Sequence, residues 1–389
     1  MKKSGKKLCV ALAIVVGVIV LVAAVAACVW GKELATLADV HPVEGNGYLY
    51  EVDYRASYDL DKLLAADVDG NAQLVNYVVG TLAKGLPIKV DVTKKKGEGA
   101  TDVAAADGEH CTSFQARNAD GKGWLYGRNY DFFKNPSLVL HSHPKDGYAS
   151  VSVCDLSHLG YGLDKVPDNF GASLLCLAAV YAPMDGMNEK GLCTSIMALP
   201  RQAARQQTGK HVAGTSILMR LWLDRCATVQ EALDLLATVD VRHDEAAGSG
   251  YHYMVADAEG HCAVVEFDLR DGWKTLVTEK PDTCNFMHVT NHLVHPKYYT
   301  TEPDSVLGNP HSRSWWRYAQ VADYMAAHAS GALTPAEAEE CLAGVHWKDL
   351  VWENGMVEDT QWSNVYDQQA LTLTLHPWND YDKAYHFGL

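Results

Sequence analysis

The sequence contains 10 Cys but no Cys-x-x-Cys pair, and neighbouring Cys residues lie 17 to 83 positions apart. This spacing excludes a dense disulfide framework and a zinc-ribbon pattern. Pro is also scarce, with 13 among 389 residues, and 21% of the chain is charged. A collagen-like, coiled-coil or disordered chain is therefore excluded. At 48% hydrophobic residues, the chain has enough apolar surface for one large domain or two ordinary ones.

Acidic residues are absent from the first 32 positions, which carry five Lys. The remainder of the chain has 28 Lys and Arg against 48 Asp and Glu, a net charge of −20. A body this acidic is repelled by phosphate backbones, so the composition argues against a nucleic-acid partner.

An uncharged run of 23 residues, Leu8–Trp30, follows four Lys residues at the N-terminus. Its length is sufficient to cross a bilayer, and a positive flank is typical of the cytoplasmic side. We expect residues 1–32 to be a signal anchor or a signal peptide, with the rest of the protein membrane-anchored and extracytoplasmic. Cys28 ends a stretch similar to a bacterial lipobox, so a lipid anchor at this residue is the alternative to a helix.

Beyond this run, the secondary-structure signals in the sequence change near residue 110. Residues 33–110 have the pattern of loops and short helices, with an amphipathic run at Ala72–Lys84. They end in a small, polar segment around Lys94–Lys96, which predicts a weakly structured loop. The part that follows has a clear succession of strand and helix signals.

Two hairpins and two capping boxes mark this second part. Strand-like residues 111–118 and 124–132 flank an Asn-Ala-Asp-Gly-Lys-Gly turn, and residues 251–267 form a second hairpin pattern. Thr228 and Thr334 each open a helix, with Glu three positions later. Strands and helices come in blocks without a strict βαβ rhythm, which predicts an α+β fold.

Cys111, Arg128 and Asp131 come together at one end of the first hairpin. If the turn centres near Gly121, the strands fold back so that Cys111 lies roughly opposite Asp131. A thiol, a guanidinium and a carboxylate would then share one site. The same pattern fits an ordinary hairpin with a buried Cys and a surface ion pair, and the hairpin alone favours that second interpretation.

Five ordered landmarks across residues 111–389 resemble the choloylglycine hydrolase / linear amide C–N hydrolase family, which includes bile salt hydrolases and penicillin V acylases. Acid ceramidase and N-acylethanolamine acid amidase are distant relatives. The landmarks are Cys111-Thr112-Ser113 with Gly127-Arg128-Asn129-Tyr130-Asp131-Phe132, Asp185-Gly186-Met187-Asn188-Glu189-Lys190-Gly191-Leu192, Val289-Thr290-Asn291, Ser314-Trp315-Trp316-Arg317-Tyr318, and Thr360-Gln361-Trp362-Ser363. The resemblance implies a four-layer αββα sandwich of the N-terminal-nucleophile (Ntn) hydrolase type.

The resemblance also implies a catalytic role for each of five residues. Cys111 would be the nucleophile and, once its α-amino group is free, the base as well. Arg128 would hold the thiolate, and Asp131 would orient the freed amine. Asn291 would donate its side-chain amide to the oxyanion, and Arg317 would keep the other charges in register. We expect no cofactor and no metal.

This chemistry requires cleavage of the His110–Cys111 bond, because 110 residues precede the nucleophile. We expect residues 33–110 to be a prosegment, either retained or released, and residues 111–389 to be the Ntn-hydrolase catalytic domain. A second departure from the family is Ala198, where bile salt hydrolases tend to have Asn. It argues against restricting the substrate to bile salts.

These features predict an amidase that hydrolyses the C–N bond of linear N-acyl amides, with a small-molecule substrate and membrane contact through the N-terminal segment. The sequence is compatible with a homo-oligomer and with a monomer. Specificity is expected from loops near residues 132–170 and 198–215. A Cys-Ntn acyltransferase, a papain-like cysteine peptidase and an inactive surface binding protein on the same fold are the alternatives.

Two further groups of residues suggest ligands. Two histidine sets have metal-ligand spacing, but no HExxH pattern accompanies them, which favours loop histidines. The sets are His141 with His143, and His288 with His292 and His295. The adjacent Trp315 and Trp316 fit an acyl pocket and core packing equally well.

Overall fold

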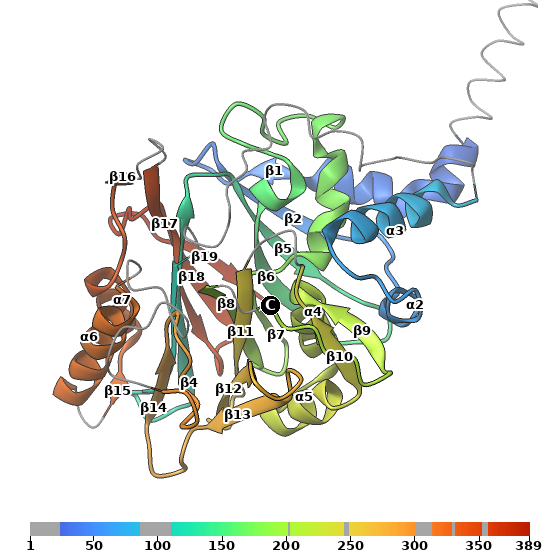
Figure 1. Cartoon of the computed structure of the whole chain (residues 1–389). Helices are drawn as coiled ribbons and strands as arrows, with labels where there is room; N and C mark the ends of the chain where they lie inside the picture. The colour runs from blue at the N-terminus through green and yellow to red at the C-terminus, as the bar shows by residue number, and fades with distance from the viewer. Residues whose placement is uncertain are drawn as a thin grey trace, which may run out of the picture.

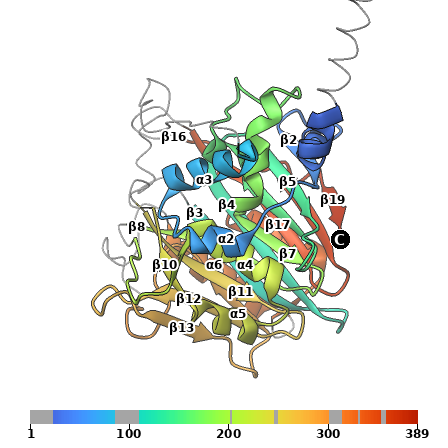
Figure 2. The same ribbon diagram turned by 90° about the vertical axis from the view of Figure 1, so that its right-hand side faces the viewer.

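Two β-sheets face each other, and helices cover both outer faces (Figure 1). The view at right angles shows the same stacking from the side (Figure 2). The computed structural model describes residues 24–85, 110–200, 203–244, 249–299, 313–328, 331–351 and 357–389. Strands pair mostly antiparallel, so the mixed fold of α-helices and β-strands expected from the sequence is confirmed.

The larger sheet has nine strands and includes residues from both sides of the predicted cleavage site. Across the sheet its strands are β1 (His41–Pro42), β2 (Leu49–Tyr54), β5 (Ser137–Ser142), β6 (Ser150–Asp155), β7 (Asp185–Asn188), β8 (Cys193–Pro200), β11 (Ser249–Ala256), β12 (Cys262–Phe267) and β13 (Thr275–Glu279). Strand β2 pairs parallel with β5 along its full length. The predicted hairpin at residues 251–267 is confirmed as β11 and β12.

The second sheet has eight strands and begins beside the hairpin of Cys111. Its main path is β14 (Phe286–Val289), β3 (His110–Asn118), β4 (Trp124–Phe133), β17 (Val357–Asp367), β18 (Thr372–Pro377) and β19 (Tyr385–Gly388). Two short strands join its sides, β15 (Ala332–Leu333) on β3 and β16 (Leu350–Val351) on β17. A parallel pair, β9 (His211–Gly214) with β10 (Val239–Arg242), stands apart from both sheets.

Helices pack on the two outer faces in separate groups. The nine-stranded sheet carries α2 (Leu60–Ala65), α3 (Asn71–Ala83), the 3₁₀ helices η3 (Leu156–Leu159) and η4 (Ala172–Tyr181), α4 (Thr215–Arg225) and α5 (Val229–Leu236). The eight-stranded sheet carries α6 (Ser314–Ala327) and α7 (Pro335–Gly344). Both predicted capping boxes are present, with Thr228 opening α5 and Thr334 opening α7.

Alternation along β3 and β4 divides the hairpin between two environments. Cys111 and Tyr130 pack into the core between the sheets, whereas Phe114 and Leu125 pack against α6 and α7. Neighbouring side chains in a strand point to opposite faces, so every second residue enters the same layer. The hairpin therefore has a face between the sheets and a face toward α6 and α7, which we call its inner and outer faces.

The expectation of a membrane-anchored, extracytoplasmic protein is contradicted. Over the described residues, no helix combines the length and the apolar character needed to cross a bilayer. Residues 24–30 of the predicted anchor belong to a helix that continues to residue 39 and docks on the fold, because the Trp30 indole donates to the Leu82 carbonyl at 2.8 Å and Glu33 pairs with Lys84 at 2.6 Å. Residues 8–23 and the loop around Lys94–Lys96 lie outside the described residues.

Gly127, in the middle of β4, is required by the packing of the hairpin. A Cβ added there would lie 2.3 Å from the ring of the fully buried Phe114. We expect Gly127→Ala to lower the free energy of unfolding by about 1–3 kcal/mol, because the ring must move within a packed layer. Urea denaturation measures this loss.

The matched control is Gly80→Ala on the exposed side of α3, where no atom lies within 4 Å of the added Cβ. This change is expected to be neutral or to stabilise by up to about 1 kcal/mol through helix propensity. Equal midpoints for both variants would contradict the packing of Phe114 over β4.

Candidate active site

The register of the hairpin decides which side chains share a face. Cys111 pairs with Tyr130, and His110 pairs with Asp131, one residue away from the predicted pairing. Residues directly opposite each other in an antiparallel pair point to the same face. The Cys111 thiol therefore lies on the inner face, whereas the Asp131 carboxylate lies on the outer face. The sequence predicted that Cys111 and Asp131 lie at the same end of the hairpin, but it did not predict that their side chains point to opposite faces.

The backbone of Cys111 is held by two buried side chains. Its N–H donates to Asn291 Oδ1 at 2.7 Å, and its carbonyl accepts from Arg317 Nη1. Arg317 also donates through Nη2 to Asn291 Oδ1 at 2.7 Å and through Nη1 to Thr112 Oγ1 at 2.9 Å. Asn291 and Arg317 are both almost completely buried. Three of the five predicted residues thus form one hydrogen-bonded cluster around a main-chain unit.

Arg128 lies on the inner face beside the Cys111 sulfur. Burial alone would lower the pKa of this guanidinium, but the neighbouring Cys111 and Asp185 outweigh burial and raise the pKa above its ordinary value. Arg128 Nη2 donates to the Ile196 carbonyl at 2.6 Å, and Nε lies 3.8 Å from an Asp185 oxygen. A fixed positive charge next to the thiol favours the thiolate.

Asp185 is the counter-ion of Arg128 and was not identified as such from the sequence. It opens the predicted Asp-Gly-Met-Asn landmark and is fully buried. Its carboxylate accepts from Trp362 Nε1 at 2.8 Å, Asn364 Nδ2 at 2.7 Å and the Tyr366 hydroxyl. These donors come from β17, so a carboxylate of the nine-stranded sheet is tied to the eight-stranded sheet behind Arg128.

Asp131 occupies the outer face, opposite His110. One carboxylate oxygen accepts from Thr360 Oγ1 at 2.5 Å, and the other has no hydrogen-bond partner among the described residues. Burial raises the pKa of Asp131 to about 7, against the opposing effect of Arg317. An acceptor without a donor in a buried site is a place for an ammonium group.

His110, the residue before Cys111, is fixed on the same outer face. Its ring is buried, stacks on Trp347 with centroids 5.0 Å apart, and hydrogen-bonds through Nδ1 to the buried Glu358. The His110–Cys111 bond is therefore fixed on both sides: the His110 ring is held by Trp347 and Glu358, and the Cys111 N–H is held by Asn291.

Asn291 is positioned by α6. Its N–H donates to Ser314 Oγ at 2.8 Å, and the same hydroxyl group contacts Thr290 Oγ1 at 2.8 Å and His292 Nδ1 at 2.7 Å. The side-chain amide of Asn291 donates to the Ala198 carbonyl at 2.8 Å. In this uncleaved chain the amide donor thus faces Ala198, and the oxygen faces Cys111 and Arg317.

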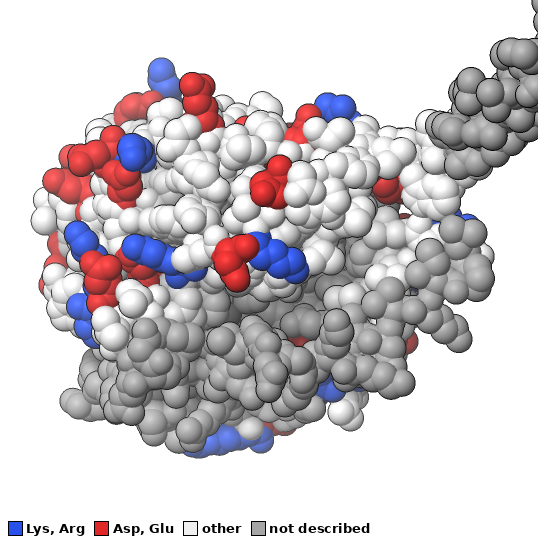
Figure 3. Space-filling model, turned by 90° about the horizontal axis from the view of Figure 1, so that it is seen from above, with Lys and Arg blue, Asp and Glu red and all other residues white. Residues whose placement is uncertain are grey.

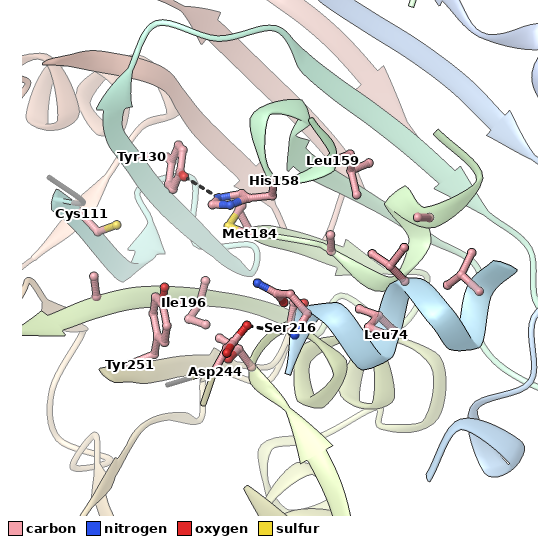
Figure 4. A pocket seen from close by; sticks show the side chains of 17 residues that line it. Leu74, Cys111, Tyr130, His158, Leu159, Met184, Ile196, Ser216, Asp244 and Tyr251 are labelled. Atoms are coloured by element: carbon pink, nitrogen blue, oxygen red, sulfur yellow. Dashed lines mark hydrogen bonds between the residues drawn. The ribbon is translucent and has the colours of Figure 1, made fainter. Parts of the chain in front are cut away.

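A pocket opens next to Cys111 (Figure 4). Cys111 lies at one end, and Leu74 of α3 lies at the opposite end, with Met184 and Ile196 between them. The apolar lining residues are Leu74, Val75, Val78, Leu159, Ala178, Ala182, Met184, Ile196 and Ala198. The polar lining residues are Asn71, Tyr130, His158, Thr215, Ser216, Asp244 and Tyr251. We call this cavity the Cys111 pocket; its composition suits an apolar group with a few polar contacts.

The loops that were expected to determine specificity supply only part of the lining of the Cys111 pocket. Residues 132–170 contribute His158 and Leu159, and residues 198–215 contribute Ala198 and Thr215. The contribution of α3 to the pocket was not predicted, because nothing in the sequence relates residues 71–78 to Cys111.

On the upper face of the molecule, acidic and basic side chains are interspersed around an extended uncharged area (Figure 3).

The histidine sets serve as structural contacts. Among the described residues, no group of three or more His, Cys, Asp or Glu side chains is arranged to hold a metal ion. His288 bonds to the Tyr318 carbonyl at 3.0 Å, and burial lowers its pKa to about 4. His141 lies 3.0 Å from Glu51. Trp315 stacks on His292 with centroids 4.4 Å apart and does not line the Cys111 pocket, so this residue packs rather than binds.

A family model described as acyl-coenzyme A:6-aminopenicillanic acid acyl-transferase matches residues 116–377. The chain belongs to this acyl-transferase family. The match begins within β3, after Cys111, and spans β4, the Asn291 segment and α6, so the resemblance to the choloylglycine hydrolase group is confirmed at the level of family and fold.

Two solved structures are similar to this acyl-transferase family member. A mutant of the conjugated bile acid hydrolase from Clostridium perfringens is 17% identical, with a TM-score of 0.50 over 72% of this chain and 92% of that one. Penicillin V acylase from Agrobacterium tumefaciens is 18% identical, with a TM-score of 0.45 over 71% of this chain and 85% of that one. No curated protein sequence matches the chain. The likeness to the Clostridium structure shows a shared mixed fold of α-helices and β-strands.

The raised pKa of Asp131 predicts a pH-dependent stability. Between about pH 4 and pH 7 the folded chain holds a proton at Asp131 that the unfolded chain has lost, so the free energy of unfolding falls as the pH rises. Asp131→Asn removes this proton equilibrium. With Cys111→Ala present in both parent and variant, we expect the variant to gain stability over its parent progressively from pH 4 to pH 7 and no further above pH 8.

Chemical denaturation at each pH measures this gain, and Asp146→Asn, at an exposed position, is the control with a constant difference. If Asp131→Asn also gives a pH-independent difference, the carboxylate does not titrate in this window.

Proposed function

We propose that the protein is an amidase that hydrolyses the C–N bond of linear N-acyl amides, with Cys111 as an N-terminal nucleophile. The observation that carries the proposal is the position of Cys111: its backbone nitrogen is bound to Asn291, its sulfur lies beside Arg128, and its side chain lines an apolar pocket. Nucleophile, charge stabilisation and acyl site therefore meet at one residue.

Maturation is an intramolecular cleavage of the precursor. The Cys111 thiol attacks the His110 carbonyl, a C–S bond replaces the C–N bond, and the nitrogen takes up a proton as the free α-amine. Water then breaks the thioester, which returns the proton to sulfur and leaves His110 as a carboxylate. The stacking of His110 on Trp347 and its bond to Glu358 hold the carbonyl for this attack. Asp131 receives the new ammonium through the oxygen that has no partner among the described residues of the uncleaved chain.

Turnover uses the same atoms on an external amide. The α-amine takes the thiol proton, and the thiolate, held by Arg128, attacks the substrate carbonyl. Charge then develops on the carbonyl oxygen, and the Asn291 amide, which faces the Ala198 carbonyl in the precursor, is the donor in reach of this oxyanion. The ammonium returns its proton to the leaving amine, and water hydrolyses the thioester.

The substrate class follows from the pocket. Nine of its lining residues are apolar. The ionisable side chains in the lining are those of Asp244, His158, Cys111 and two tyrosines, and Asp244 is the one carboxylate among them. An apolar acyl group fits such a lining, as in N-acyl amino acids, conjugated bile acids or penicillin V. We rank N-acyl amino acids first, because Ala198 lacks the side-chain contact expected in bile salt hydrolases.

A second candidate is acyl transfer, which the description of the family model favours. The same acyl-thioester would be attacked by an amine instead of water. Hydrolysis and transfer share every step up to that intermediate, so they differ only in the acceptor.

The test is turnover by the processed enzyme. N-octanoyl glycine, glycocholate and penicillin V are each incubated with and without a competing amine, and acid, amine and new amide are quantified. We expect acid to be the main product, abolition by Cys111→Ala, and a kcat lower by about 10²-fold for Asn291→Ala. New amide in excess of acid would select the acyltransferase. Cleavage of internal peptide bonds in proteins without turnover of any amide would select the peptidase.

A further inference from the structure

Helix α3 precedes the nucleophile by some 30 residues in sequence and yet forms a wall of the Cys111 pocket. Leu74, Val75 and Val78 all line the cavity from successive turns of this helix. Leu74 projects into the cavity from the side opposite Cys111 (Figure 4). An acyl group bound to the Cys111 sulfur therefore has its free end directed toward α3.

The start of α3 is attached to the rest of the fold by charge pairs. Asp69 accepts from Arg205 at 2.6 and 2.7 Å, in a bidentate pair, and from Arg242 at 3.1 Å. Two residues further on, the N–H of Asn71, the first residue of α3, donates to Asp244 Oδ2 at 2.9 Å. The two arginines hold the pKa of Asp69 below its ordinary value in spite of its burial. Bidentate Arg–carboxylate pairs are the geometrically specific kind, so they fix both position and orientation.

Other contacts attach the same N-terminal part without passing through the His110–Cys111 bond. Strand β2 is hydrogen-bonded to β5 inside the nine-stranded sheet. The hydroxyl group of Tyr54 donates to the Leu177 carbonyl of η4 at 2.8 Å. Cleavage before Cys111 breaks none of these contacts.

We propose that α3 sets the length of the acyl group that the Cys111 pocket accepts, which requires residues 33–85 to stay bound after cleavage. This inference rests on the proposed function. A helix clamped at its N-terminal end and packed across the end of a cavity is a fixed stop. Side chains at positions 74 and 78 then decide where an acyl chain must end.

The experiment compares Leu74→Trp, Leu74→Ala and the wild type on N-acyl glycines from butanoyl to hexadecanoyl. Asn76→Trp, at an exposed position of α3 that does not line the pocket, is the matched control. For Leu74→Trp we expect kcat/KM to fall by about 30-fold on the long chains and to stay within about threefold on the butanoyl substrate. Leu74→Ala should shift the preferred length upward, and Asn76→Trp should leave the profile unchanged.

Gel filtration of the processed wild type is the second readout, and it should yield both fragments in one peak. An unchanged length profile in both Leu74 variants, or an equal loss at every length, would overturn the role of α3. Loss of the N-terminal fragment with retained long-chain activity would overturn its retention.

Binding of free fatty acids of the same lengths to the Cys111→Ala variant separates this inference from the proposed function. We expect the same length dependence and the same effect of Leu74→Trp. Length-dependent binding without turnover of any amide by the wild type would contradict the amidase and preserve the role of α3. Binding that ignores both length and Leu74→Trp would overturn the role of α3.

Discussion

A buried guanidinium holds the centre of this molecule together. Arg317 is fully excluded from solvent and donates to the Cys111 carbonyl, to Thr112 Oγ1 and to Asn291 Oδ1. A charge in such a place is stable only when hydrogen bonds replace the lost water. Helix α6, strand β3 and the segment after β14 must therefore meet in one arrangement. Cys111 and Asn291, the proposed nucleophile and oxyanion donor, are fixed by the same requirement, so the site is as rigid as the packing around Arg317.

The hairpin that carries Cys111 separates two kinds of chemistry. Its inner face presents the thiol to Arg128 and to the apolar pocket, and its outer face carries Asp131 and the His110 ring, which bonds to Glu358. Sulfur and nitrogen of one residue thus lie in different electrostatic surroundings. This separation suits the proposed double role of Cys111 as nucleophile and base, and it follows from the alternation of side chains along a β-strand.

Local signals in the sequence predicted the local structure. The hairpin turn, both capping boxes and the hairpin of β11 and β12 depend on residues a few positions apart, and all are present. Contacts over long separations were out of reach: Asp185 with β17, Asp131 with Thr360 and α3 with the Cys111 pocket each join segments that no short pattern relates. The expectation of a membrane-anchored protein was wrong, because hydrophobic length alone does not show that Trp30 and Glu33 contact Leu82 and Lys84 at the end of α3.

The central claim is that catalysis requires a free amine on Cys111, and the intact mass of the purified, active protein tests it most directly. We predict two fragments held together, one of which begins at Cys111 on N-terminal sequencing, and a single uncleaved chain for Cys111→Ala. Full amidase activity in a preparation that consists only of uncleaved chain would contradict the claim, because the nitrogen of Cys111 would then be an amide that accepts no proton.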